Sequence, residues 1–170
     1  MDLIEIKEIK SDQIAVYKSF FQVGLKNDED NFRISLNDDL SAPFPTKDSE
    51  DSFTLGAYVK HELVGVVSFE RDGEHREKLR HKGTLFRMYV SSQSRGLGVG
   101  KTLIKTLFDM VKNIPNIERI NLTVISHNIN AIKLYEGFSF VIFSKEVNAI
   151  KWKGRYFTEL QMAVKIPAND

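Results

Sequence analysis

The chain has 170 residues, of which 42% are hydrophobic and 28% charged, and its formal net charge is +1. A chain of this length can bury one core, and we expect residues 1–170 to form a single domain. The small net charge disfavours a nucleic-acid or membrane-surface binder, which needs a basic excess. The absence of cysteine excludes a disulfide framework and a thiol nucleophile.

The first residues do not read as a targeting segment. Met1 to Glu5 carry charges where a signal peptide needs an apolar core. No apolar run approaches the length of a transmembrane helix. The sequence therefore predicts a cytoplasmic protein that does not bind membranes.

The first forty residues predict one strand and two helices. Residues 3–9 partly alternate between apolar and polar, which favours a strand. Residues 11–13 supply N-cap candidates for a helix whose apolar residues continue to Leu25. Residues 27–30 could cap a second, weaker helix through Phe32, Leu36 and Leu40.

A proline pair ends this helical region. Pro43 and Pro45 break any helix, and residues 46–52 are typical of a polar loop. Phe44, between the two prolines, would either line a substrate pocket or pack into the core. We favour the core.

The next segment predicts two strands and an exposed connection. Residues 53–60 and 63–70 read as strands joined by a tight turn at 60–62, and the run 64–67 is typical of a strand buried on both faces. Residues 71–82 are strongly charged and contain the Asp-Gly turn signal.

Metal binding is not expected in the charged connection. His75 and His81 lie there, and neither they nor the surrounding carboxylates repeat a known ligand spacing. A solvated loop accounts for both histidines.

The stretch from Arg95 to Thr102 organises the chain. Residues 85–90 before it favour a buried strand, and apolar residues recurring from Val99 to Val111 form one face of a helix. Between them stand three alternate glycines, Gly96, Gly98 and Gly100.

This glycine turn predicts an anion site. Glycine tolerates positive φ and close approach, and the first N–H groups of a helix have no intrahelical partner. Together with the helix dipole they suit a phosphate or pyrophosphate, and Arg95 and Lys101 add positive charge at the rim. The alternative is a strand-to-helix turn that uses glycine only for its geometry.

Two nucleotide-binding motifs fail on residue identity. A dinucleotide fingerprint needs G-x-G-x-x-G, whereas these glycines are spaced two and two, and Glu118 opens a strand instead of closing one. A P-loop would need glycine at position 95, which is Arg95. The strand at 117–125 also ends without the Asp that would hold Mg²⁺.

The last third of the chain completes a mixed α/β pattern. Pro115 ends the long helix, residues 117–125 form a strand, and residues 129–136 form a short helix. Residues 138–145 and 155–166 are the last two strands, connected through 146–154. The total is about seven strands and four helices, which predicts a mixed sheet with helices on both faces.

Two motifs carry a family resemblance. Arg95-x-x-Gly98-x-Gly100 follows a strand that ends Met-Tyr-Val, and Asn128-x-x-Ala131-x-x-Leu134-Tyr135-Glu136 follows one strand and one helix later. In this order and spacing they resemble the GNAT superfamily of acyl-CoA N-acyltransferases, over roughly residues 50 to 165. The resemblance implies the GNAT fold and an acetyl-CoA-dependent N-acetyltransferase that needs no metal.

The resemblance also implies a route for the coenzyme. The pyrophosphate would lie on the backbone of the glycine turn, and the pantetheine arm would pair with the preceding strand as an added strand. A backbone N–H of that strand would polarise the thioester carbonyl. The implied cofactor-binding residues are Met88, Tyr89, Val90, Arg95, Gly96, Leu97, Gly98, Val99, Gly100, Lys101, Thr102 and Asn128.

Two side chains of the second motif have alternative interpretations. Asn128 resembles the family residue that contacts the pantetheine arm, and it also stands where an N-cap is expected. Tyr135 resembles the general acid that protonates the departing thiolate, and it could equally be a core aromatic. The family usually continues with glycine where this chain has Ser139, which affects how the helix exits and where Tyr135 points.

The general base is the weakest part of the prediction. An alkylamine arrives mostly as ammonium and must lose a proton before it attacks. Many relatives carry a carboxylate where this chain has Thr84. Glu70 is the best remaining carboxylate, Asp72 or a water chain are alternatives, and Arg87 cannot act as a base. Glu70 could also be an ordinary surface charge.

Three functions are compatible with the motifs to different degrees. Direct transfer of an acetyl group to a small or peptide amine in a ternary complex, the reaction that the resemblance implies, is favoured, since the chain lacks cysteine and a Gly-x-Ser-x-Gly nucleophile elbow. An acyl-CoA sensor or scaffold without turnover is the alternative, and a nucleotide hydrolase is disfavoured. The acceptor pocket would be built from residues 14–50, 71–82 and 146–155, which carry no motif. Homodimers are common among similar proteins.

Overall fold

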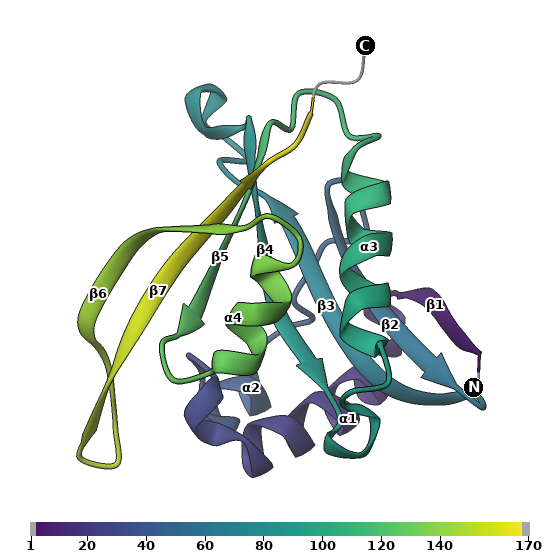
Figure 1. Ribbon diagram of the computed structural model, residues 1–170. Helices are drawn as coiled ribbons and strands as arrows, with labels where there is room; N and C mark the ends of the chain where they lie inside the picture. The colour runs from purple at the N-terminus through teal and green to yellow at the C-terminus, as the bar shows by residue number, and fades with distance from the viewer. Residues whose placement is uncertain (1–2, 168–170) are drawn as a thin grey trace.

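The computed structural model describes residues 3–167, so Met1 and Asp2 and residues 168–170 of the expected domain lie outside the described part. Seven strands form one sheet in the order β1-β2-β3-β4-β5-β7-β6 (Figure 1). The strands are β1 Ile4–Ile9, β2 Ser52–Val59, β3 Glu62–Arg71, β4 Lys82–Val90, β5 Arg119–Ile125, β6 Val141–Trp152 and β7 Arg155–Lys165. The helices are α1 Ile14–Asn27, α2 Leu36–Ser41, α3 Val99–Val111 and α4 Ile129–Glu136. The predicted mixed α/β fold is confirmed.

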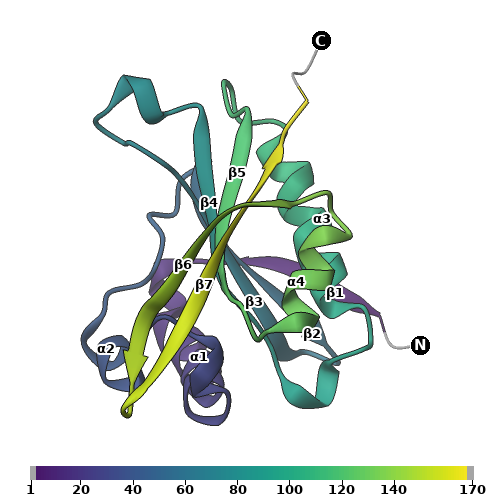
Figure 2. The same ribbon diagram turned by 60° about the vertical axis from the view of Figure 1, so that its left-hand side comes forward.

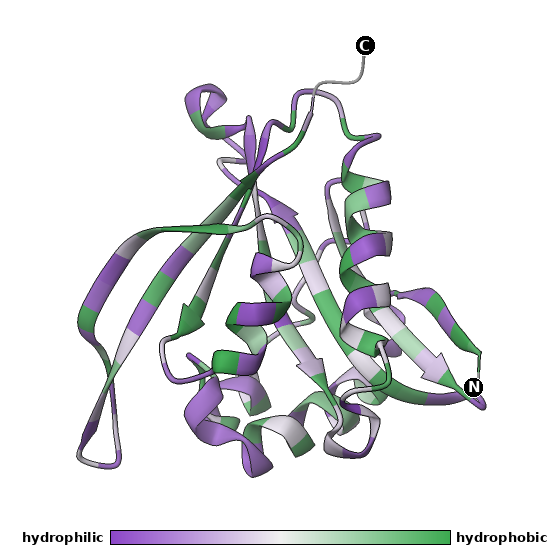
Figure 3. Cartoon of the chain, in the orientation of Figure 1, coloured by the Kyte–Doolittle hydropathy of each residue, from purple (hydrophilic) through white to green (hydrophobic). Residues whose placement is uncertain are grey.

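Each face of the sheet carries its own core, because alternate side chains of a strand point to opposite faces. Val67 and Phe69 of β3 pack with Leu103 of α3 and Tyr135 of α4 on one face. Val66, on the other face, packs with α1. The run 64–67 is therefore buried on both faces, as its composition predicts, and hydrophobic and hydrophilic bands alternate along α3 and β7 (Figure 3).

The sheet opens between β4 and β5. These two strands are parallel and pair only at their beginnings, where Lys82, Gly83 and Thr84 face Arg119, Ile120 and Asn121. Beyond Thr84 the strands diverge, as the two views show (Figures 1 and 2). The edge of β4 that faces β5 therefore has no strand partner from residue 85 to Val90.

The end of the chain differs from the sequence prediction. The connection predicted at 146–154 is mostly strand: β6 runs to Trp152 and only the Lys153-Gly154 turn separates it from β7. The strand continues because residues 150–152 pair with residues 155–157 of β7, and a register shift between Glu146 and Ile150 absorbs the irregular part. Residues 138–140, predicted to open this strand, form the exit from α4, with Ser139 at φ 66°.

The second helix also starts later than predicted. Residues 29–31 form a 3₁₀ turn, and α2 begins only at Leu36. Ser35 accepts from the Asp38 N–H, and Asp38 accepts from the Ser35 N–H, which is a capping box. Phe44 packs against the core and its ring lies edge-on to Tyr17 at 5.4 Å, as we favoured.

No helix within residues 3–167 combines the length and the apolar character needed to cross a membrane.

Candidate active site

The turn between β4 and α3 leaves its backbone N–H groups available. Gly96 and Gly98 have φ of 77° and 86°, a region that favours glycine, and a Cβ built on either would meet no atom within 4 Å. From Gly96 to Lys101, no backbone N–H donates a hydrogen bond of normal geometry to a described residue. These groups converge at the first turn of α3, where the helix dipole favours an anion.

The third glycine serves packing. Gly100 lies within α3, and a Cβ there would come within 3.0 Å of Leu134 Cδ2 and 3.3 Å of Met88 Cε. The missing side chain lets α3 approach β4 and α4 closely. Between the three glycines, Leu97 is exposed and Val99 is buried.

Two side chains of the turn, Arg95 and Thr102, hydrogen-bond to the protein, and a third, Lys101, is exposed. The Arg95 guanidinium donates to Asp28 Oδ2 at 2.8 Å and to the Val90 carbonyl at 3.1 Å, so it ties the turn to the end of α1. Its own N–H donates to Ser92. The Thr102 hydroxyl donates to the Gly98 carbonyl. Lys101 is exposed and has no ion pair within the described residues, so it is the cation that stands at the rim.

The strand β4 carries a bulge next to its open edge. Val66 of β3 faces Tyr89, but Ser68 faces Phe86, so β4 contains one extra residue at this point. Arg87, within the bulge, has φ 49°. Met88 and Val90 pack toward α3 and Tyr89 toward α1, so their side chains belong to the two cores while their backbone lines the opening.

A buried ion pair holds the bulge. Arg87 Nη1 donates to Asp39 Oδ1 at 2.8 Å, and Asp39 of α2 is fully buried. The guanidinium also lies over the Phe21 ring at 5.4 Å. Sequence reasoning considered Arg87 only as a base and missed this role, because the pair joins residues 48 positions apart and has no local signal.

The helix α4 presents both residues of the second motif. Asn128 caps it, since Oδ1 accepts from the Ala131 N–H at 3.3 Å, whereas Nδ2 has no hydrogen-bond partner among the described residues. Tyr135 is 6% exposed and packs edge-on to Phe140 at 5.8 Å. Its hydroxyl makes no hydrogen bond within residues 3–167. Burial raises the pKa of the Tyr135 hydroxyl above its ordinary value, so the group stays protonated at neutral pH.

Both candidate bases line one cavity. Glu70 faces Thr84 across the β3–β4 pair, and the Thr84 hydroxyl donates to Asp72 Oδ1 at 2.7 Å. The cavity has a volume of about 380 Å³ and also contacts Phe86. Glu70 Oε1 lies 3.4 Å from Lys47 Nζ. Glu70 shares the face of Val66, whereas Tyr135 belongs to the core on the opposite face.

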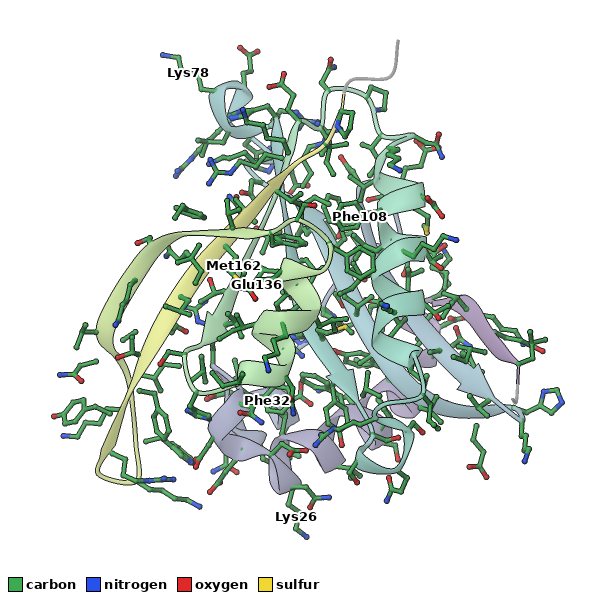
Figure 4. All side chains as sticks on the ribbon, in the orientation of Figure 1. Lys26, Phe32, Lys78, Phe108, Glu136 and Met162 are labelled. Atoms are coloured by element: carbon green, nitrogen blue, oxygen red, sulfur yellow. The ribbon has the colours of Figure 1, made fainter. Side chains whose placement is uncertain are left out.

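A second cavity, the hairpin pocket, lies between the segment 25–38 and the β6–β7 hairpin. Its volume is about 470 Å³. Much of its wall is apolar, and it includes Phe32, Ile34, Ile125, Ile150, Trp152 and Phe157. Phe32 lies at the α2 end of the molecule, below α4 (Figure 4). This pocket joins two of the three regions from which we expected an acceptor site.

Two ion pairs join the tip of the hairpin to the segment before α2. Lys153 Nζ lies 2.8 Å from Glu29 Oε1, and Arg155 Nη2 lies 2.7 Å from Asp30 Oδ2. The tip of the hairpin therefore rests against the α1–α2 segment (Figure 2). No pattern in either segment alone predicts these pairs, which join residues 124 and 125 positions apart.

No group of three or more His, Cys, Asp or Glu residues within the described chain is arranged to hold a metal ion.

The fold and this site define a mixed α/β protein with an opening between two parallel strands and a cradle of N–H groups at one end. A sequence model of the acetyltransferase (GNAT) family matches residues 17–140. The chain belongs to this family.

Individual relatives agree with this membership. The chain is 30% identical over 87 residues to a spermine/spermidine N(1)-acetyltransferase of Bacillus subtilis, a match that covers 51% of this chain and 57% of the relative. It is 28% identical over 109 residues to the L-amino acid N-acetyltransferase AaaT of Escherichia coli, covering 64% and 65%. Less than two thirds of either relative is therefore spanned.

Solved structures share the fold over nearly the whole chain. A GNAT-family acetyltransferase from Streptococcus pneumoniae superposes with a TM-score of 0.80 at 22% identity, covering 96% of this chain and 100% of that one. At this identity the likeness concerns the fold.

Proposed function

We propose that the protein, as a single domain, is an N-acetyltransferase that transfers the acetyl group of acetyl-CoA directly to a primary amine. One observation carries the proposal: the uncommitted N–H groups from Gly96 to Lys101 stand beside an unpaired edge of β4. The relatives named for polyamines and for amino acids act on molecules with primary amines, which supports an amine acceptor.

The residues present fit the coenzyme. The N–H groups of the turn, with Lys101 at the rim, would hold the diphosphate, and the open space above Gly96 and Gly98 leaves room for it. The backbone of Met88, Tyr89 and Val90 would pair with the pantetheine amides. Nδ2 of Asn128 is available to donate to the same arm. When bound, acetyl-CoA supplies the activated acetyl thioester.

Catalysis would then use one backbone group and two side chains. A β4 N–H at the bulge would polarise the thioester carbonyl, and a donor of this kind is worth about 2.7–4 kcal/mol in acyl transfer. Tyr135 Oη would deliver its proton to the leaving sulfur, because burial keeps the hydroxyl protonated. Glu70, with Asp72 as the alternative, would take the proton of the incoming ammonium from the opposite face of the sheet.

Acetyl-CoA binding and turnover test this proposal in sequence. We expect titration with acetyl-CoA to show saturable binding, and a panel of amines to release free CoA. Binding without CoA release from any amine would favour the alternative, a sensor or scaffold without turnover. Tighter binding of ATP than of CoA would contradict both.

The proposal also includes a cytoplasmic location and a homodimer. Cell fractionation tests the location, and sedimentation of the purified chain tests the dimer.

A further inference from the structure

The hairpin pocket is poorly suited to a polycation. Two of its carboxylates, Glu29 and Asp30, are already paired with Lys153 and Arg155. Asp38, the third, accepts the Ser35 N–H at the start of α2. A polyamine would therefore compete with the protein's own cations for Glu29 and Asp30.

Two aromatic rings of the pocket already make cation–π contacts with side chains of the protein. Lys153 lies over the Trp152 ring at 5.6 Å, and Arg155 lies over the Phe157 ring at 5.2 Å. Cation–π contacts of this kind are the usual alternative to carboxylates for binding an ammonium group. The protein's own cations therefore compete with a ligand ammonium group for these two rings.

Arg33, a cation of the pocket wall, forms an ion pair with a buried carboxylate. Arg33 Nε lies 2.5 Å from Oε1 of Glu159, a residue of β7 that is 2% exposed. This Glu159 oxygen accepts no hydrogen bond of normal geometry within residues 3–167. Its contact with a charged group is the ion pair with Arg33. Removing Arg33 would therefore leave a buried carboxylate unpaired, which is costly.

The outer end of the Arg33 side chain is available. The side chain is 64% exposed, and neither Nη1 nor Nη2 donates a hydrogen bond of normal geometry to a described residue. A guanidinium offers these donors as a planar fork that matches a carboxylate. Lys26, another cation of the pocket wall, points away from the body of the molecule (Figure 4).

We propose that the acceptor is an amino acid with an apolar side chain, whose carboxylate binds the Arg33 fork. This inference rests on the proposed acetyltransferase function and specifies its substrate class. The apolar side chain would lie against Phe32, Ile34 and Ile150. The volume of about 470 Å³ lies within the range of small-ligand sites.

The first experiment compares acceptors that differ in one group. CoA release is followed with L-phenylalanine, L-phenylalaninamide and spermidine at saturating acetyl-CoA. The amide keeps the side chain and the amine but lacks the carboxylate, so we expect its kcat/KM, corrected for the fraction of neutral amine, to be at least about tenfold lower, the value of one good polar contact. Equal rates for the acid and the amide, or a preference for spermidine, would overturn the proposal.

Two variants then test Arg33 itself. Arg33→Lys keeps a cation beside Glu159 but removes the fork, and Arg33→Gln with Glu159→Gln removes both charges without leaving one unpaired. In each we expect KM for L-phenylalanine to rise about tenfold with kcat largely retained, and the amide to be unaffected. Arg76→Gln, an exposed arginine of the connection between β3 and β4, is the matched control. An equal loss with the acid and the amide would contradict carboxylate recognition.

Failure of the proposed acetyltransferase function would give a different result from failure of the carboxylate site. If acetyl-CoA binds but no amine releases CoA, the acetyltransferase function fails. Calorimetric titration of L-phenylalanine into the CoA-bound protein then decides whether the hairpin pocket binds the amino acid. Binding that Arg33→Lys weakens would keep the carboxylate site. No binding of L-phenylalanine would overturn it.

Discussion

The two sides of the opening in the sheet are built by different means. On the α3 side, the groups proposed to hold the coenzyme are mainly backbone: glycine conformations, a helix start and an unpaired strand edge. On the hairpin side, the site consists of side chains from distant segments, joined by ion pairs such as Glu29–Lys153 and Arg33–Glu159. The first arrangement suits a constant ligand, and the second can change its specificity through single substitutions.

The largest effect should come from the acid on the α3 side. We expect Tyr135→Phe to lower kcat by about 10²- to 10⁴-fold, because it removes the only proton that Tyr135 can donate. Acetyl-CoA affinity, measured by calorimetry, should be unchanged. Tyr17→Phe is the matched control, since it removes another buried tyrosine hydroxyl, in the core on the opposite face of the sheet. Similar kcat losses in both variants would contradict the acid role.

The buried pair behind the bulge should matter mainly for stability. Arg87→Gln leaves the carboxylate of Asp39 fully buried without its cation, which costs about 3–5 kcal/mol in the free energy of unfolding. Denaturant unfolding measures this loss. Adding Asp39→Asn should restore much of the stability, and a double variant as unstable as the single one would show that the charge is not the cause.

A glycine pair separates backbone strain from anion binding. Gly98→Ala and Gly154→Ala both place a Cβ at positive φ in open space, at a cost of about 1–2 kcal/mol each. Both should lower the melting temperature to a similar extent. Only Gly98→Ala should weaken acetyl-CoA binding, by about tenfold. If Gly154→Ala weakens it equally, the turn has no special role.

The exposed pairs at the hairpin tip should have a small effect. Lys153→Gln removes the Glu29 pair, and because water screens such pairs we expect KM for the acceptor to rise by no more than about fivefold. Added salt should produce the same change in the wild type and little further change in the variant. An unchanged KM at all salt concentrations would separate the tip from acceptor binding.

The smallest effect concerns alkaline pH. Since burial raises the pKa of Tyr135, its hydroxyl stays protonated as the pH rises, and kcat should not fall between roughly pH 8 and 10. Near-UV circular dichroism over the same range checks that the fold persists. A fall in kcat centred near the ordinary tyrosine pKa, with the fold intact, would contradict an enclosed hydroxyl.

The same comparison explains how far the sequence could predict the structure. The order of the elements, the glycine turn and the α4 motif are local patterns, so the fold, the conformation of Gly98 and the cap at Asn128 could be predicted. The extension of β6 could not, because residues 146–152 are mostly exposed and form a strand through pairing with β7. The ion pairs of Arg33, Arg87 and Glu159 were not predicted because their partners are distant in sequence.

The central claim is that the backbone between β4 and α3 holds the diphosphate of the coenzyme. Calorimetric titration with acetyl-CoA and with S-acetylpantetheine, which lacks the diphosphate and the 3′-phosphoadenosine attached to it, tests it. We predict saturable binding of acetyl-CoA and binding of S-acetylpantetheine that is weaker by about a hundredfold or more. Equal affinities for the two, or no binding of acetyl-CoA, would contradict the claim.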